Sequence, residues 1–189
     1  MIRIPSRPAR IALLLWVALS GLSPALARSQ KGDWEIGYHR GQTRFIDSKD
    51  LDNTRFHGFN VGYCLTNLFE LAVNSDSVET ESEDGRDDHN LDYRTLDFIF
   101  NLGEDAHKPF LMASVGKIDK TSRLRPLPGI SRRVTDEIPL FEVGLGYRGY
   151  VGRRLGLRFD ARLSFFDNEG DHFSLNEKDL RWALGIFVN

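Results

Sequence analysis

The chain has 189 residues, of which 41% are hydrophobic and 28% are charged, and its formal net charge at pH 7 is −2. This length suits one domain better than two, and the near balance of charge gives no basic footprint for nucleic acid. Cys64 is the only cysteine, so no disulfide can form within the chain.

The first 27 residues have the pattern of an export signal. Three arginines in the first ten residues precede the apolar run 11–22, which is short for a membrane helix, and Ala-Leu-Ala at 25–27 fits a cleavage site. We expect cleavage after Ala27 and a single mature domain over 28–189. Because the leader takes three arginines and no acid with it, 22 basic residues remain against 27 acidic ones.

From residue 34 onward, apolar and polar residues alternate with the period of two that a β-strand requires. In chain order, the stretches that we expect to be strands are 34–39, 58–63, 69–74, 95–100, 110–118, 141–148, 155–166 and 180–188. The alternation in 110–118 is too poor to orient that strand. It is clearest in 155–166, whose twelve residues exceed the roughly 9–11 that a tilted membrane-crossing strand needs.

The connections between these stretches alternate between long and short. Long polar connections are expected at about 41–54, 77–91, 119–138 and 167–178, and short turns at 65–68, 103–108 and 149–154. Eight antiparallel strands in this order predict an all-β, up-and-down barrel with four long loops at one rim and three tight turns at the other.

Alternation alone does not show which set of residues faces the barrel interior. A soluble carrier of the lipocalin type encloses its apolar set, whereas a membrane barrel turns it outward, and Gly32 and Trp34 match the Gly-x-Trp that opens lipocalins. However, the polar set is rich in glycine and in charges of both signs, which suits a crowded interior. Aromatic residues also lie near the expected strand ends, where a membrane barrel has its interfacial girdle. We therefore expect an eight-stranded transmembrane β-barrel.

Strand phrases such as Phe-Asn-Val-Gly-Tyr at 59–63 and Phe-Glu-Val-Gly-Leu-Gly-Tyr at 141–147 resemble those of the OmpA-like eight-stranded outer-membrane β-barrel domain family. The resemblance covers 33–189. It implies a location in the outer membrane of a Gram-negative type of cell, insertion by the barrel-assembly machinery, and contact with outer-membrane lipid and lipopolysaccharide. It also implies a monomer that needs no cofactor. The aromatic residue that the assembly machinery reads near the end of such chains is Phe187 here.

Charged residues of both signs fall in the set that this orientation places inside the barrel. They are Glu35, Glu70, Asp97, Glu142, Arg158, Asp160, Arg162 and Arg181. Because unpaired buried charges are costly, we expect these eight to form an ionic network across the lumen. Closure of the first strand on the eighth would bring Glu35 and Arg181 onto neighbouring strands. Two roles remain open: a packed plug that fixes the register, or a network that rearranges to open a small pore.

Two of the expected loops carry opposite charges. The acidic one holds Asp76, Glu79, Glu81, Glu83, Asp84, Asp87 and Asp88. We interpret it as a solvated loop, because it lacks the EF-hand spacing of a calcium site. The basic one holds Lys117, Lys120, Arg123, Arg125, Arg132 and Arg133. Its charge suits contact with lipopolysaccharide phosphates or with the acidic loop.

His172 and Ser174 form the one candidate catalytic pair. Their His-x-Ser pattern resembles that of the outer-membrane lipid A deacylases of the PagL kind, which are also eight-stranded barrels and supply a glutamate on the following strand. The matching stretch 184–187 has no acid, so we predict no catalytic residue. The remaining histidines lack metal-ligand spacing. The glycines at 144, 146 and 149 match a dinucleotide fingerprint only formally, because they lie in a predicted strand with no helix after it.

These patterns favour a non-enzymatic outer-membrane barrel with a role in envelope integrity or in surface interaction. A lipid A esterase and a soluble periplasmic lipocalin-like carrier are the two alternatives.

Overall fold

The computed structural model describes residues 30–46, 53–81, 88–103, 106–127, 130–151, 154–166 and 177–189, and within 81, 123–133 and 177 it describes the backbone only. The expected leader and cleavage site, residues 1–27, lie outside these ranges. The strands are β1 (Trp34–Phe45), β2 (Thr54–Cys64), β3 (Phe69–Glu81), β4 (Asp88–Asn101), β5 (His107–Leu127), β6 (Ile130–Tyr150), β7 (Leu155–Phe166) and β8 (Glu177–Val188). Within the described ranges, no helix is long and apolar enough to cross a membrane.

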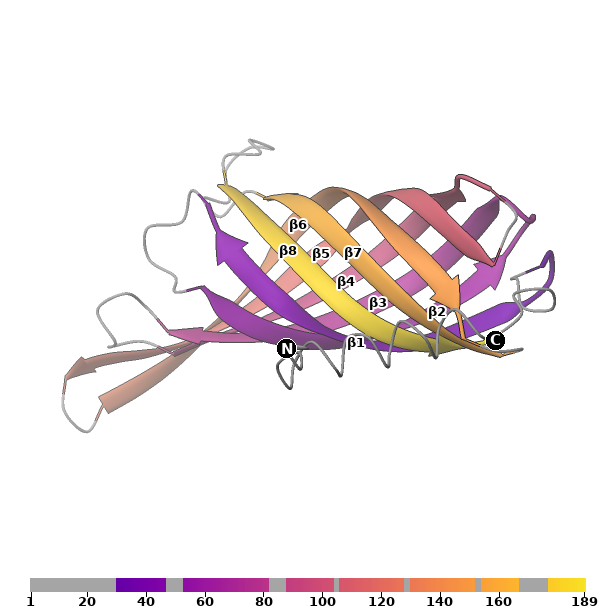
Figure 1. The fold of residues 1–189 in the computed structure, drawn as a ribbon. Helices are drawn as coiled ribbons and strands as arrows, with labels where there is room; N and C mark the ends of the chain where they lie inside the picture. The colour runs from indigo at the N-terminus through magenta and orange to yellow at the C-terminus, as the bar shows by residue number, and fades with distance from the viewer. Residues whose placement is uncertain are drawn as a thin grey trace, which may run out of the picture.

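The eight strands form one closed antiparallel barrel in chain order, with β1 hydrogen-bonded to both β2 and β8 (Figure 1). The predicted all-β, up-and-down fold is therefore confirmed. Following paired residues once around the barrel from Glu35 leads back to β1 at Phe45, a stagger of ten residues between positions 35 and 45. For eight strands such a stagger corresponds to a tilt of about 40° from the barrel axis.

The apolar residues of the alternating pattern point outward on every strand. Leu184 and Val73 are 64% and 61% exposed, and comparable side chains lie on the six other strands. The polar partners of the same alternation point inward and are buried. This orientation follows from the pleat: a shift of one residue would carry the charged set outward.

Aromatic side chains gather on the outer face near the rim that carries the short turns. Trp34 packs against Tyr63 with ring centroids 5.0 Å apart, and Phe69 packs against Phe100 at 4.9 Å. Such a girdle is characteristic of the membrane–water interface, where an aromatic ring contacts acyl chains and headgroups together.

The connection between β5 and β6 differs from the prediction. Residues 119–138 were expected to form a basic loop, but they continue the two strands as a ladder that reaches Leu127 and Ile130. The ladder from β6 to β7 already ends at Leu140 and Phe166, so the β5–β6 hairpin projects beyond the barrel rim (Figure 1). Much of the expected acidic loop is also strand, because β3 runs on to Glu81 and β4 begins at Asp88.

The interior is not wholly polar. Phe110 and Met112 point inward from β5, while Leu111 points outward. Apolar side chains on both faces explain why the alternation of 110–118 was unreadable. A larger group of apolar side chains, which includes Phe56, Tyr93 and Phe166, also lies inside the barrel.

Barrel closure can be tested by crosslinking across β1 and β8. Tyr38 and Ile186 are paired positions in that ladder, and paired Cα atoms are about 4.5–5.5 Å apart, within the reach of a disulfide. In a Cys64→Ser background, we expect Tyr38→Cys with Ile186→Cys to crosslink in the folded protein. Mass spectrometry of the oxidised chain measures this.

The matched pair Tyr38→Cys with Leu145→Cys should stay reduced, because β6 is not a neighbour of β1. Equal crosslinking of the two pairs would contradict the closed strand order.

Candidate functional site

The cluster of charges nearer the short turns is built around Arg148 on β6. Its Nη1 donates to Glu35 Oε2 at 2.9 Å and to Glu70 Oε2 at 2.7 Å, and the three side chains are almost fully buried. The guanidinium also lies over the rings of Phe110 and Phe187, with centroid distances of 5.1 and 5.8 Å. One cation thus joins acids of β1 and β3 across the lumen.

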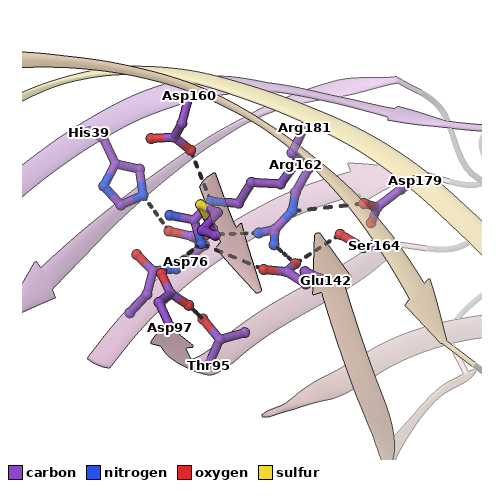
Figure 2. A network of polar contacts seen from close by, with 12 residues as sticks. His39, Asp76, Thr95, Asp97, Glu142, Asp160, Arg162, Ser164, Asp179 and Arg181 are labelled. Carbon is purple, nitrogen blue, oxygen red and sulfur yellow. Dashed lines mark hydrogen bonds and ion pairs between the residues drawn. The ribbon is translucent and has the colours of Figure 1, made fainter. Parts of the chain in front are cut away.

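A second cluster is built around Arg181 on β8 (Figure 2). Its Nη1 donates to Asp76 Oδ2 at 2.7 Å, its Nη2 donates to Glu142, and its Nε lies 3.8 Å from Asp179 Oδ1. The guanidinium stacks over Tyr93, 4.1 Å from the ring centroid. All four partners are themselves buried, and Asp179 also belongs to β8.

Arg162 on β7 extends this second cluster (Figure 2). Its Nε donates to Asp160 Oδ1 at 2.9 Å, and its Nη1 lies 3.2 Å from Asp97 Oδ2 and 3.5 Å from Glu142 Oε2. Arg158 donates to the other oxygen of Asp160 at 3.0 Å. Glu142 therefore receives both Arg162 and Arg181 and links the two guanidinium groups.

Other polar side chains add contacts to these carboxylates. Ser164 donates to Glu142 at 2.8 Å, Thr95 to Asp97 at 2.6 Å, and Tyr93 to Asp179 at 2.7 Å. Asp76 accepts from Asn74 Nδ2 at 2.9 Å, and its Oδ1 lies 2.6 Å from His39 Nε2. The polar donors compensate the carboxylates for the water that they lose on burial.

An apolar layer separates the two clusters. It consists of Ala72, Ile99, Phe110 and Met112. Phe110 lies between them, because its ring is approached by Arg148 from one side at 5.1 Å and by Arg158 at 4.8 Å. Charged and apolar layers thus alternate along the barrel axis.

Glycines make room for these side chains. A Cβ on Gly62 would collide with Glu70, and one on Gly58 would collide with Asp76 and with the backbone of Ser75. The inward glycines that the alternation predicted therefore leave room for the longer acidic side chains of the neighbouring strands.

The structure places all eight sequence-predicted residues inside the barrel with buried side chains, but in two groups. Glu35 and Glu70 belong to the cluster of Arg148, and the other six belong to the cluster of Arg162 and Arg181. Glu35 and Arg181 do lie on neighbouring strands, yet they are not paired, since Arg181 lies opposite Thr43 in the ladder.

Several members of the clusters were not predicted from the sequence. Among the described residues they include His39, Asn74, Asp76, Tyr93, Thr95, Arg148, Ser164 and Asp179. Asp76 lies in the run that the sequence predicts as an acidic loop, and Asp179 falls between the predicted loop 167–178 and the predicted strand 180–188. Arg148 ends the predicted strand 141–148 at a position of the polar set, and this position is the signal that could have placed it in the network.

No metal centre is assembled within the part of the chain that the structure describes. Among the described residues, no group of three or more histidine, cysteine, aspartate or glutamate side chains is arranged to hold a metal ion. Cys64 is buried, and the glycines at 144, 146 and 149 lie within β6. His172 and Ser174 lie outside the described residues, and so does most of the run from Glu81 to Asp87.

Known structures share this fold, although no protein-family model and no curated protein sequence matches the chain. Neisserial surface protein A is similar with a TM-score of 0.66 at 15% identity, over 82% of this chain and 96% of that one. Ail of Yersinia pestis, crystallised with the heparin analogue sucrose octasulfate, gives 0.61 at 16%, over 84% and 99%. The N-terminal β-barrel domain of Pseudomonas aeruginosa OprF gives 0.55 at 16%, over 84% and 98%. At these identities the likeness concerns the fold, which is that of eight-stranded outer-membrane barrels.

Removal of Arg148 should destabilise the barrel strongly. Arg148→Met leaves Glu35 and Glu70 buried without their cation, and breaking a buried pair in this way costs about 3–5 kcal/mol. We expect a loss of that size in the free energy of unfolding, measured by denaturant titration in lipid vesicles.

Two further variants separate charge from packing. Adding Glu35→Gln and Glu70→Gln to Arg148→Met should restore much of the loss, because the unpaired charges are gone. The pair of Arg94 and Asp119, 3.3 Å apart with the Arg94 side chain exposed, provides the control: Arg94→Gln should cost less than about 1 kcal/mol. An Arg148→Met variant as stable as Arg94→Gln would contradict the assigned role.

Proposed function

We propose that this chain is a non-enzymatic outer-membrane β-barrel protein that serves envelope integrity or surface interaction. In this proposal, residues 1–27 are a cleaved export signal and residues 28–189 are the membrane domain. The domain is inserted by the barrel-assembly machinery, acts as a monomer and contacts outer-membrane lipid and lipopolysaccharide.

The observation that carries the proposal is the direction of the side chains. Large apolar residues are exposed on all eight strands, whereas Glu35, Asp97, Glu142, Arg148 and Arg181 are fully buried. In water this arrangement would be costly on both faces, since it exposes a continuous apolar surface and buries charge. In a bilayer the same outer surface contacts acyl chains. The fold of the structural neighbours agrees with this environment.

The arrangement of side chains supports a soluble lipocalin-like carrier less well than a membrane barrel. A lipocalin-like protein needs an apolar cavity within a polar outer surface. Here the interior is crossed by ion pairs at Arg148, Arg162 and Arg181, and large apolar side chains are exposed on the outer face of all eight strands.

The contacts of the ionic clusters support a structural plug over an open pore. Arg181 reaches Asp76 on the opposite wall at 2.7 Å, and Arg148 joins Glu35 and Glu70 across the lumen. The buried ring of Phe110 lies against both Arg148 and Arg158, with centroid distances of 5.1 and 4.8 Å. A permeating ion would have to break several buried ion pairs and displace this ring.

The projecting β5–β6 hairpin suits a surface-interaction role. Its backbone ladder runs beyond the barrel to Leu127 and Ile130, and the sequence of that segment is basic, with arginines at 123, 125, 132 and 133. Such a segment favours polyanionic partners, including the phosphates of lipopolysaccharide. A structural neighbour, Ail, was crystallised with a sulfated sugar, which is consistent with this chemistry.

A charge placed on the outer face of β6 tests the membrane environment. Leu145 is 60% exposed in the middle of the apolar belt, and an arginine near the bilayer midplane costs about 2–4 kcal/mol. We expect Leu145→Arg to lower the free energy of unfolding in lipid vesicles by that amount and to reduce recovery in the outer-membrane fraction.

Thr135→Arg is the matched control, because residue 135 is exposed on the same face of β6 but above the belt. It should change stability by less than about 0.5 kcal/mol. A chain that fractionates with soluble periplasmic proteins, and whose gel migration does not change on heating, would overturn the proposal.

A further inference from the structure

The apolar belt on the outside of the barrel has unequal height. At a tilt of about 40°, each residue of a strand adds about 2.5 Å along the axis. Starting from the rim of short turns, apolar outward positions on β7 run from Leu155 to Phe165, about 25 Å in height. On β1 they run only from Trp34 to Tyr38, about 10 Å. The first value matches the roughly 25 Å apolar band of outer-membrane barrels, and the second falls well short of it.

Aromatic pairs lie at the upper edge of the belt, and they show the same difference in height between strands. On β6 and β7 the last pair is Phe141 with Phe165, with ring centroids 6.3 Å apart. On β1 and β2 the last pair is Tyr38 with Phe59, at 5.2 Å. The upper edge of the apolar belt is therefore lower on β1 and β2 than on β6 and β7.

Basic residues occupy the wall above Tyr38 and Phe59. They are Arg40 and Arg44 on β1 and Arg55 and His57 on β2, here called the β1–β2 basic patch; all four are exposed. In the ladders Arg40 lies opposite His57, and Arg55 lies opposite Gln42, which separates Arg40 from Arg44. Neighbouring strands are about 4.8 Å apart and alternate residues about 7 Å, so the four groups share one small area.

The patch lies beside the hydrocarbon-facing surface. Arg40 is paired across the β1–β8 ladder with Leu184, which is 64% exposed within the belt. By the height scale above, Arg40 lies about 15 Å above Trp34, inside the span that β7 covers with apolar side chains. A guanidinium at this depth needs water or an anion that the membrane itself supplies.

Elsewhere on the barrel, outward basic side chains at a similar height are paired with acidic residues of the protein. Lys117 Nζ lies 2.7 Å from Glu137 and 3.1 Å from Asp119, and Arg94 lies 3.3 Å from Asp119. By contrast, no hydrogen bond or ion pair joins a side chain of the β1–β2 basic patch to any other described residue. Among the described residues, the exposed acid nearest in the ladder is Glu79 on β3, which follows Val78, the partner of Phe56. Counted over the described strands, the patch therefore carries a net positive charge.

We propose that the β1–β2 basic patch binds a multiply phosphorylated lipid headgroup of the surrounding leaflet. The depth of the patch indicates a lipid as the carrier of the anion, and the group of three arginines and a histidine matches more than one phosphate charge. This inference rests on the proposed membrane location. It assigns a lipid site to the barrel wall, separate from the projecting β5–β6 hairpin.

The experiment compares lipid retention by the folded, purified full-length chain in nonionic detergent. The probes are lipid A with both phosphates, the same lipid after dephosphorylation, and phosphatidylcholine, and native mass spectrometry counts the bound lipid. We expect the parent chain to prefer the diphosphorylated lipid over the dephosphorylated one by at least about tenfold. Arg40→Gln with Arg55→Gln should abolish most of that preference.

The matched control is Arg94→Gln with Lys117→Gln, which also removes two outward cations and should keep the preference. The inference is overturned if the control loses as much as the Arg40/Arg55 variant, if that variant keeps the preference, or if equimolar free pyrophosphate displaces the lipid.

Insertion of each variant into phosphatidylcholine vesicles is scored separately by heat-modifiable migration. A parent chain that fails to insert counts against the proposed function. A chain that inserts without headgroup preference counts against the lipid site alone.

Discussion

Carboxylates from five strands meet two guanidinium groups, and the rest of the barrel is arranged around that convergence. Asp76, Asp97, Glu142, Asp160 and Asp179 come from β3, β4, β6, β7 and β8 and surround Arg162 and Arg181. Because each charge is buried, each needs its partner at the correct height, and the ladders determine that height. The network and the stagger of ten residues therefore specify each other: a slipped strand would leave several charges unpaired and turn others toward the apolar side.

The interior also explains the composition of the strands. Eight strands enclose a space that side chains fill, so long arginines on one wall require glycine or short residues on another. Gly58 and Gly62 fulfil this requirement beside Asp76 and Glu70. Phe110 then separates the two charged layers while its ring faces Arg148 and Arg158. The same residues thus provide both space and charge balance inside the barrel.

Much of this arrangement could be predicted from the sequence, for identifiable reasons. Period-two alternation predicted the eight strands and, on all of them but the fifth, which residues share a face; the charges and glycines of the polar set then favoured placing that set inside. β7 matched its expected bounds of 155–166. Alternation could not show that Arg148 meets Glu35, because contacts across the lumen depend on the stagger, which no single strand encodes. Asp76 was hidden in an acidic run, and Phe110 and Met112 in a stretch apolar on both faces. The outer halves of β5 and β6 were missed because polar residues dominate their sequence and leave too few apolar residues to show a period of two.

The unequal height of the apolar belt determines how the barrel fits a bilayer. A bilayer offers nearly one thickness all round a barrel only some tens of ångströms wide. A wall that is apolar for about 25 Å on β7 and for about 10 Å on β1 cannot match one thickness all round the barrel. Hydrophobic mismatch costs fractions of a kilocalorie per ångström, and leaning does not relieve this one, because a tilted barrel presents the same length of every strand to the bilayer. A bilayer around this barrel would instead have to become thinner beside β1.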